Sequence, residues 1–435
     1  MLTAPFLTDI DSQAAVKGSR DPLGLQTIWA RLGRHVVGNL TTVSTSVRDF
    51  TTLVLGYYFA ERVANESAGD GDLAVFLRWE QLAAYARGEI NRDFNFRGVE
   101  RVKNNLKEGG RVRLGTDSTA QILSNQKTYG LWGLYSVPAR SSGLVEGDPT
   151  RLTAAGRDLV EHVYLPIFAK EGVRNADAVV ARLAKPRADI DLGRTDRRLV
   201  EAVAKVLAKR LGSAEREAYR MHLLLGGPQD KTVGGQATLA KAMESTFDEE
   251  DWTLSPPRVR HLAKRCRAEG DIGSAVADRL ERIRTAELLL APSAALFGLV
   301  LNSDGQTIPE LARTVRRQWG ASVRTIDPDE TASLETELRD STGDAETGRR
   351  WVKLARALGA GEFAAAIALL MEQNAFVMKA RAAGGPWVDL SGGRLRVRFR
   401  DENAGELPDK SELPDFWRHS YFLDSLRTVA LALRP

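Results

Sequence analysis

The sequence is poor in the side chains that most often build covalent or metal-based catalytic sites. It has one cysteine, Cys266, in 435 residues, which excludes an internal disulfide and a multi-cysteine zinc site. Its five histidines are scattered, without the HExxH spacing of a zinc protease. It also lacks a nucleophile elbow and the glycine–lysine spacing of a phosphate-binding loop. We therefore expect a protein that is not an enzyme, with no catalytic residue, no metal and no cofactor.

Long apolar runs are missing as well. The most apolar uncharged stretch, Leu288 to Leu301, contains Pro292 and is shorter than the ~20 residues that span a bilayer. A buried helix or helix pair explains this stretch better than a membrane span. The first residues, MLTAPFLTDIDSQ, lack the basic start and continuous apolar core of a secretory signal. A cytoplasmic location is expected.

Neither sign of charge dominates the chain. The 61 lysine and arginine residues exceed the 57 aspartate and glutamate residues slightly, which leaves a net charge of +4. A mildly basic balance is compatible with a nucleic-acid partner but does not require one. The hydrophobic fraction of 43% and the charged fraction of 27% are ordinary for a folded protein. Because 435 residues exceed what one core normally organises, at least two domains are expected.

Apolar residues recur at helical spacing over most of the chain, which predicts a mainly α, multi-domain fold. A helical N-terminal domain is expected over residues 1–170, and a winged helix-turn-helix module is expected inside it. A polar stretch over residues 171–195 predicts a linker. A second helical domain is expected over residues 196–435, with a small β-hairpin and a closing C-terminal helix.

The hairpin is predicted from WVDLSGGRLRVRFR, residues 387–400, in which two alternating strands meet at Gly392-Gly393. Successive side chains of a strand point to opposite faces, so the arginines of the second strand share one face and the apolar residues share the other. The closing helix is expected from about residue 416 to residue 433. The arginine face consists of Arg394, Arg396, Arg398 and Arg400.

One segment, residues 117–164, carries a functional signal. Its pattern predicts a helix, then a second helix that ends at Ser142, and then two short strands around a polar turn. Thr153 follows the second strand, where its side-chain oxygen is placed to cap another helix. The strands and their turn are expected at Gly143–Val145, Thr150–Leu152 and Gly147-Asp148-Pro149.

This order resembles the winged-helix proteins, particularly regulators of the MarR type. In that family the recognition helix leads into a Gly-Leu-Val strand, a wing follows, and the next helix opens with Thr-x-x-Gly-Arg. The matching residues here are Ser141-Ser142-Gly143-Leu144-Val145 and Thr153-Ala154-Ala155-Gly156-Arg157. Pro138 departs from the pattern, because a proline inside the recognition helix removes a backbone hydrogen bond and costs ~3 kcal/mol.

The resemblance implies a non-enzymatic nucleic-acid-binding protein, with DNA as the expected partner. The second helix would face the groove and the wing would touch a phosphate, while basic side chains neutralise further phosphates. Two other basic patches are expected to extend this surface, one on a helix near residue 260 and one on the hairpin. The expected contact residues are Gln126, Lys127, Arg140, Ser141, Ser142 and Arg151, then Arg258, Arg260 and Lys264, and finally Arg394, Arg396 and Arg398.

Other functions stay open. Winged helices also serve as protein-docking modules, so a purely structural subunit fits the same pattern. A nuclease or another enzyme whose carboxylates are dispersed in the sequence would leave no local motif. The whole chain also resembles uncharacterised bacterial proteins associated with anti-phage defence, through Asp21–Gly33, Ser124–Tyr135 and Ser420–Leu426. That resemblance implies a protein that helps to recognise invading DNA or loads an effector onto it, as an adaptor subunit of a multi-protein system with other protein subunits as partners.

Overall fold

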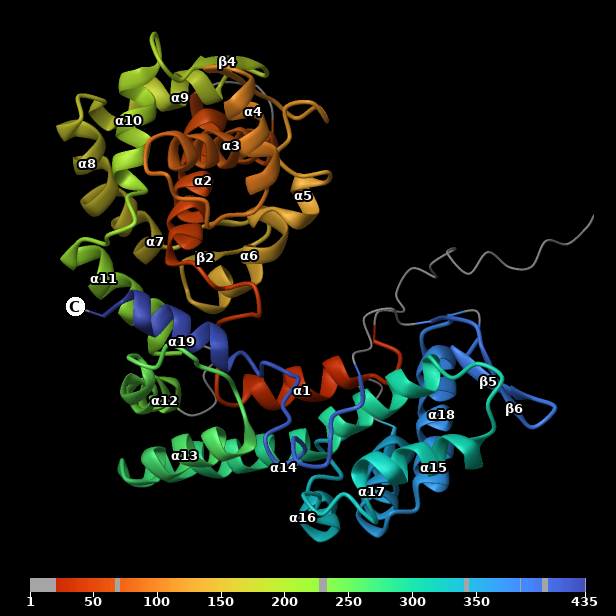
Figure 1. The fold of residues 1–435 in the computed structure, drawn as a ribbon. Coiled ribbons are helices and arrows are strands. Elements are labelled where there is room, and N and C mark those ends of the chain that lie inside the picture. Colours follow the sequence, from red (N-terminus) through yellow and green to blue (C-terminus); the bar gives the residue numbers. More distant parts are fainter. Residues whose placement is uncertain are drawn as a thin grey trace, which may run out of the picture. The chain divides into compact units, whose positions relative to one another are not determined.

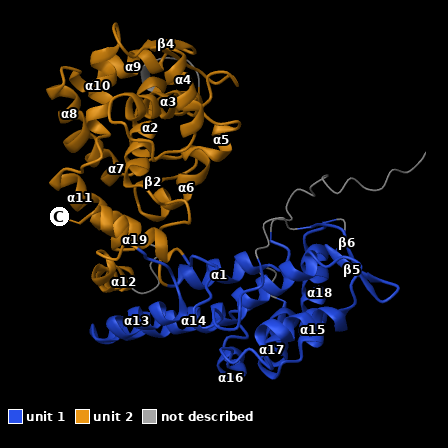
Figure 2. Cartoon of the chain, viewed as in Figure 1, with its two compact units in different colours: residues 1–35, 251–421 blue, residues 36–250, 422–435 orange. Residues whose placement is uncertain are grey.

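A computed structural model describes residues 21–66, 71–226, 233–339, 344–383, 385–400 and 406–434. These residues are mainly helical, as the sequence predicts, and they include three two-stranded antiparallel sheets (Figure 1). The chain forms two compact units (Figure 2). Unit 1 contains residues 1–35 and 251–421, and unit 2 contains residues 36–250 and 422–435. Unit 2 is therefore inserted into the sequence of unit 1, and the chain passes between the units three times.

The chain does not divide at residues 171–195, where a linker was expected. That stretch holds α9 (Asp177–Leu183) and β4 (Ala188–Asp191), and β4 pairs antiparallel with β1 (Arg111–Leu114) inside unit 2. Alternate residues of both strands are buried, so the polar composition of this stretch reflects half-exposed strands. The two expected domains, residues 1–170 and 196–435, are replaced by two discontinuous units.

Two neighbouring helices, α2 (Val47–Glu66) and α3 (Asp72–Glu89), form the centre of unit 2 (Figure 1). They pack closely because Gly56 presents no side chain to the ring of Phe76; a Cβ there would lie 2.6 Å from that ring. The indole of Trp79 is buried and donates a 2.7 Å hydrogen bond to a carbonyl of α2. Helices α4 (Val99–Glu108), α6 (Leu131–Ser141), α9 and α10 (Arg197–Val206) pack around this pair.

The remaining elements of unit 2 are short helices, two of them π-helical, and one pair of short strands. These elements are α5 (Gln126–Tyr129), β2 (Val145–Glu146), β3 (Arg151–Leu152), α7 (Ala154–Leu159), η1 (Val160–Tyr164), α8 (Leu165–Lys170), η2 (Arg174–Ala176), α11 (Ser213–Tyr219), η3 (Arg220–Leu224), α12 (Gly235–Met243), η5 (Glu244–Thr246) and α19 (Leu423–Ala432). The last helix, α19, begins later than the sequence predicts and packs on η3 and α12.

A buried polar network connects α2 to the two π-helical segments. Arg48 forms an ion pair with Glu215, and both side chains are almost completely enclosed. Tyr164 donates a 2.8 Å hydrogen bond to the Glu215 carboxylate, and its hydroxyl lies 2.9 Å from that of Tyr219. Tyr164 ends η1, and Tyr219 comes directly before η3. The paired charges and the hydroxyls bond to one another, as burial favours, and among the described residues only the Arg48 Nε of this network has no partner.

The long helix α14 (Gly270–Leu301) organises unit 1. Its 32 residues correspond to about 48 Å. Helix α13 (Pro256–Arg267) folds back along it so closely that a Cβ on Gly273 would lie 1.9 Å from the Cys266 carbonyl oxygen. Helix α1 (Leu25–Arg34) also packs on α14. Helix α14 continues through Pro292, so the apolar stretch Leu288 to Leu301 is part of one buried helix.

The end of α14 leads into the second half of unit 1. Its elements are α15 (Ile308–Trp319), α16 (Pro328–Ala332), α17 (Ala345–Ala360), α18 (Phe363–Ala380), β5 (Val388–Ser391) and β6 (Arg394–Val397). Helix α18 packs against α14, α15 and α17, and the β5–β6 hairpin packs beside α18.

Two described helices, α14 and α18, are long and apolar enough to cross a bilayer by length and composition alone. In α14, 89% of the apolar window is buried inside the protein, which is typical of the core helix of a soluble protein. In α18 the buried share is 44%.

The predicted hairpin is present. Strands β5 and β6 pair antiparallel, and Gly392 and Gly393 have φ angles of 58° and 75°. Positive φ at both central residues of a two-residue turn is readily adopted by glycine, which explains the Gly-Gly pair. Leu395 is buried and exchanges 2.8 Å backbone hydrogen bonds with Gly305 and Gln306, so the hairpin is fixed to the loop after α14.

Candidate nucleic-acid interface

The strand pair predicted between Ser142 and Thr153 is present in unit 2. β2 and β3 pair antiparallel and form the β2–β3 hairpin directly after α6. The Thr153 hydroxyl accepts a 3.1 Å hydrogen bond from the Gly156 amide and donates a 2.8 Å bond to the Gly143 carbonyl. Thr153 therefore caps α7, as expected. β1, which precedes this segment, pairs with β4 and not with the β2–β3 hairpin.

The Thr-x-x-Gly-Arg pattern has a packing role. A Cβ on Gly156 would lie 2.3 Å from the Leu144 carbonyl oxygen, so only glycine lets α7 approach the chain this closely. Arg157 forms a 2.5 Å ion pair with Glu61 of α2. Together with the Thr153 cap, these contacts fix α7 against both the β2–β3 hairpin and the core of unit 2.

Three expected contact residues, Gln126, Ser141 and Ser142, are buried, with exposures of 0%, 7% and 1%. The Gln126 amide donates 2.7 Å and 3.1 Å hydrogen bonds to Glu80 and to the Leu77 carbonyl. A side chain enclosed in this way cannot reach a nucleic acid without unfolding its surroundings. These three residues are therefore removed from the candidate interface.

Glu80 is the carboxylate that holds the start of α6. It is 4% exposed and accepts a 2.7 Å hydrogen bond from the Leu131 amide, besides the bond from Gln126. Burial raises the pKa of Glu80 to about 7, because the charged form loses its hydration, although these hydrogen bonds act in the opposite direction. The contact has a structural role: it determines where α5 ends and α6 begins.

The remaining expected cations of this segment differ in their availability. Arg151 forms an ion pair with Asp72. Arg140 is exposed and donates a 2.8 Å hydrogen bond to the Thr150 hydroxyl, so its guanidinium lies across the β2–β3 hairpin. Lys127 is exposed and makes no ion pair within the described part of the chain. Lys127 and Arg140 are thus the two cations of unit 2 from the expected set that stay available to a phosphate.

One group of the expected cations of unit 1 lies on α13, whose apolar and polar residues occupy opposite faces. Its apolar residues are buried against α14, and Ser255 caps its first turn. Arg260, Lys264 and Arg265 are exposed and form no ion pair with any residue that the structure describes. Arg258 is half-buried, with its guanidinium 4.6 Å from the ring centre of Trp252. The basic face of α13 is therefore defined by Arg260, Lys264 and Arg265.

The arginine row of the hairpin is partly neutralised. Arg396 and Arg398 both pair with Asp389 on the neighbouring strand, at 2.7 Å and 2.6 Å. The hydrogen bond from Arg396 is the main cause that lowers the pKa of Asp389 to about 2. Arg394 donates a 2.9 Å bond to the Gly305 carbonyl. The sequence analysis did not predict these ion pairs, because it considered the second strand alone and not Asp389, which lies opposite Arg396 on the first strand.

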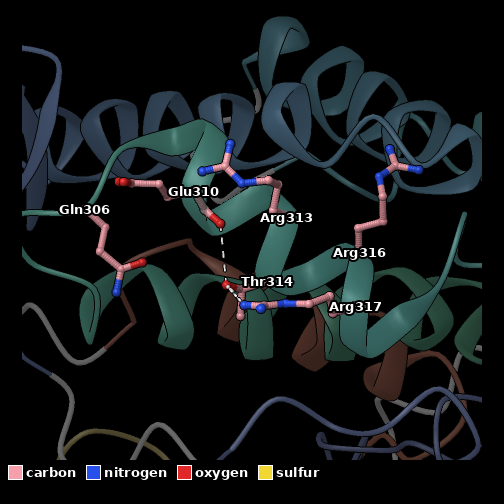
Figure 3. Close-up of a pocket in the computed structure, with 6 residues that line it drawn as sticks. All are labelled: Gln306, Glu310, Arg313, Thr314, Arg316 and Arg317. Carbon is pink, nitrogen blue, oxygen red and sulfur yellow. Dashed lines mark hydrogen bonds between the residues drawn. The ribbon is translucent and has the colours of Figure 1, made fainter.

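A basic site that the sequence analysis did not single out lies on α15. A hollow of about 530 Å³ is lined there by three exposed arginines and three other polar residues (Figure 3). The spacing i, i+3, i+4 of the arginines on one helix was the signal that could have found it. The lining residues are Gln306, Glu310, Arg313, Thr314, Arg316 and Arg317.

A second enclosed carboxylate, Glu287 of α14, holds residues 417–421, which come directly before the chain passes from unit 1 to unit 2 for the last time. It is 0% exposed and accepts hydrogen bonds from two backbone amides, from His419 Nδ1 at 2.8 Å and from the Tyr421 hydroxyl at 2.7 Å. Trp29 of α1 stacks on the His419 ring at 6.0 Å between centroids. This cluster fixes residues 417–421 to the long helix of unit 1.

The chain matches no protein-family model, no curated protein and no solved structure. The MarR-type and defence-associated resemblances therefore stay predictions. Within the described ranges, no group of three histidine, cysteine, aspartate or glutamate residues is arranged to hold a metal ion. Burial raises the pKa of the Cys266 thiol to about 12, so this thiol stays protonated at neutral pH.

Proposed function

We propose that this protein is a non-enzymatic DNA-binding or adaptor subunit of a cytoplasmic bacterial multi-protein system. The observation that carries the proposal is the basic face of α13. Arg260 and Lys264 lie one helical turn apart on an exposed surface, with Arg265 beside them, while the opposite face is buried on α14. Cations displayed in this way neutralise phosphates and release the counterions condensed on DNA.

The segment from α5 to α7 supports the same function in unit 2. Its order of helices, strand pair and capped helix fits a winged helix-turn-helix module, and Lys127 and Arg140 supply exposed cations. Ser141 and Ser142 are buried and Pro138 lies inside α6. These features favour contacts with the DNA backbone over base reading in a groove. A role in anti-phage defence, with other subunits as partners, rests on the sequence resemblance alone.

Salt-dependent DNA binding tests this proposal. Fluorescence anisotropy of a short labelled duplex is measured in EDTA, from about 50 to 200 mM salt, and binding is expected to weaken linearly on a log–log plot. The charge-reversed variant R260E/K264E is expected to bind about tenfold more weakly and to lower the salt slope by about 2. K127E/R140E is expected to act in the same direction.

The matched control is K353E/R356E, which reverses two exposed cations of α17 that pair with no carboxylate among the described residues and changes the net charge equally. It is expected to lose less than half as much affinity as R260E/K264E. Failure of the unmodified protein to bind DNA at low salt would contradict the proposal and favour a protein-docking subunit. Cleavage of the duplex when a divalent cation replaces EDTA would favour the nuclease alternative.

A further inference from the structure

The hollow on α15 is built around a helix that is anchored at both ends. Thr307 and Glu310 form a capping box at the first turn, in which the Glu310 carboxylate accepts two 2.8 Å hydrogen bonds from Thr307. At the last turn, the indole of Trp319 is buried and donates a 2.8 Å bond to the Pro408 carbonyl. The helix therefore presents its exposed side chains from a fixed backbone.

The three arginines of this face are held to different degrees. Arg316 donates a 2.6 Å hydrogen bond to the Gly361 carbonyl, and its guanidinium lies 5.5 Å from the Phe363 ring centre. Arg317 donates a 3.1 Å bond to the Thr314 hydroxyl, which Figure 3 shows beside it. Arg313 makes no side-chain hydrogen bond or ion pair with the residues that the structure describes. Arg313 and Arg317 thus keep most of their donors for a ligand.

The charge of the hollow is strongly positive. Its lining contains three arginines and one carboxylate, Glu310, whose bound oxygen is already occupied by Thr307. Arg394 of the hairpin adds a further cation nearby, where it acts electrostatically on Glu310. A guanidinium presents two parallel N–H donors that match the oxygens of a phosphate. Phosphate groups are therefore the ligand chemistry that this hollow fits.

The lining also limits what the rest of the ligand can be. The described residues that line the hollow include no aromatic side chain, so its walls offer no ring on which a base could stack, and its apolar area comes from the carbon atoms of polar and charged residues. Stacking on aromatic side chains is how proteins usually hold an unpaired base. A ligand bound here is recognised through its phosphates. Arg313 and Arg317 lie one helical turn apart, so they can contact successive phosphates of a nucleic-acid backbone.

We propose that the α15 hollow binds the phosphodiester backbone of a nucleic-acid strand through Arg313 and Arg317, with Arg316 held as a fixed neighbouring charge. This inference rests on the proposed DNA-binding function and adds a site in unit 1 that is separate from the basic face of α13. Thr314 and Gln306 provide hydrogen-bonding groups at its edge. The contact is independent of base sequence.

The test uses the full chain and the variant R313E/R317E, because both side chains are exposed and unfolding is not expected. Arg316 is left unchanged, since it packs on Phe363. Anisotropy with labelled duplex DNA in EDTA is expected to show a tenfold loss of affinity and a salt slope lowered by about 2. K353E/R356E again provides the matched change of charge, and thermal melting confirms that all variants fold.

Two outcomes separate this inference from the proposed function. If the unmodified protein binds DNA and R313E/R317E loses no more affinity than K353E/R356E, the α15 site is overturned while the proposed function stands. If the unmodified protein does not bind DNA, both are overturned. Titration with inorganic triphosphate is the second arm of the test. If the protein binds triphosphate but not DNA, the hollow is assigned to a free phosphorylated ligand and the nucleic-acid contact is overturned.

Discussion

At the scale of single residues, Glu80 shows how burial changes the chemistry of a carboxyl group. Its side chain lies among the helices of unit 2, next to a small enclosed space that Asp49, Arg87 and Arg97 also line. The backbone amide of Leu131 and the side chain of Gln126 are its hydrogen-bond donors. They stabilise the charged form, but they do not replace the hydration that the carboxylate loses.

This environment makes stability depend on pH. The pKa of Glu80 is about 7 in the folded protein against 4.5 for a free glutamate, so the folded state keeps its proton while the unfolded state loses it. The free energy of unfolding is expected to fall as pH rises from 4.5 to 7, by about 3 kcal/mol at most, and to level off above. Urea unfolding at a series of pH values across this range measures the free energy of unfolding.

In E80Q this decline is expected to be much smaller, because glutamine does not titrate. Asp49, whose pKa burial also raises, titrates in both proteins and acts electrostatically on Glu80, so a smaller decline remains in E80Q. E108Q, a change at an exposed glutamate of α4, is the control and is expected to follow the unmodified protein. A decline of equal size in E80Q and in the unmodified protein would show that Glu80 is not the group responsible.

Single residues of the candidate interface also show which exposures the sequence predicts and which it does not. Exposure of Lys127, Arg140, Arg260 and Lys264 follows from their helices, and the structure places all four at the surface. Burial of Gln126 does not follow, because its partners come from α3, more than forty positions earlier. Side-chain partners distant in sequence are invisible to a reading of local patterns.

At the scale of elements, the close approach of α7 to the chain before it depends on one glycine. In G156A, the added Cβ would meet the Leu144 carbonyl oxygen at 2.3 Å, and backbone must move to relieve it. We expect a loss of about 1–3 kcal/mol in the free energy of unfolding, measured from urea midpoints. G193A is the control, since a Cβ there meets nothing within 4 Å. Equal midpoints for the two variants would contradict this account.

Elements that depend on local chemistry were the most predictable. The hairpin at residues 388–397 followed from alternation and a Gly-Gly turn, and the Thr153 cap followed from a side chain that bonds three residues ahead. The strand at Ala188–Asp191 was missed because its partner, Arg111–Leu114, lies far away in the sequence. A short strand of alternating Asp and apolar residues is indistinguishable from a polar linker until that partner is known.

At the scale of the whole molecule, each unit contains its own buried charge cluster. Glu215 with Arg48 stabilises unit 2, and Glu287 with its four donors stabilises unit 1. In E287Q the four donors lose their common acceptor charge, so residues 417–421 are expected to open more often. Amide hydrogen exchange there is expected to rise about tenfold, while α2 and α3 in unit 2 stay unchanged.

The control for this prediction is E372Q, at an exposed position of α18 in the same unit. It is expected to leave exchange unchanged throughout. An increase in E287Q that is spread equally over both units would mean that Glu287 supports the whole chain and not the segment at the third crossing.

The insertion of unit 2 into the sequence of unit 1 also constrains how the protein is made. Helix α1 leaves the ribosome before α14, on which it packs, and α14 follows only after all of residues 36–250 have been synthesised. Unit 2 in turn receives α19 after residues 251–421 have emerged. The core of unit 1 therefore cannot form around α14 until the first part of unit 2 has been translated, and unit 2 cannot receive α19 until the rest of unit 1 has been translated.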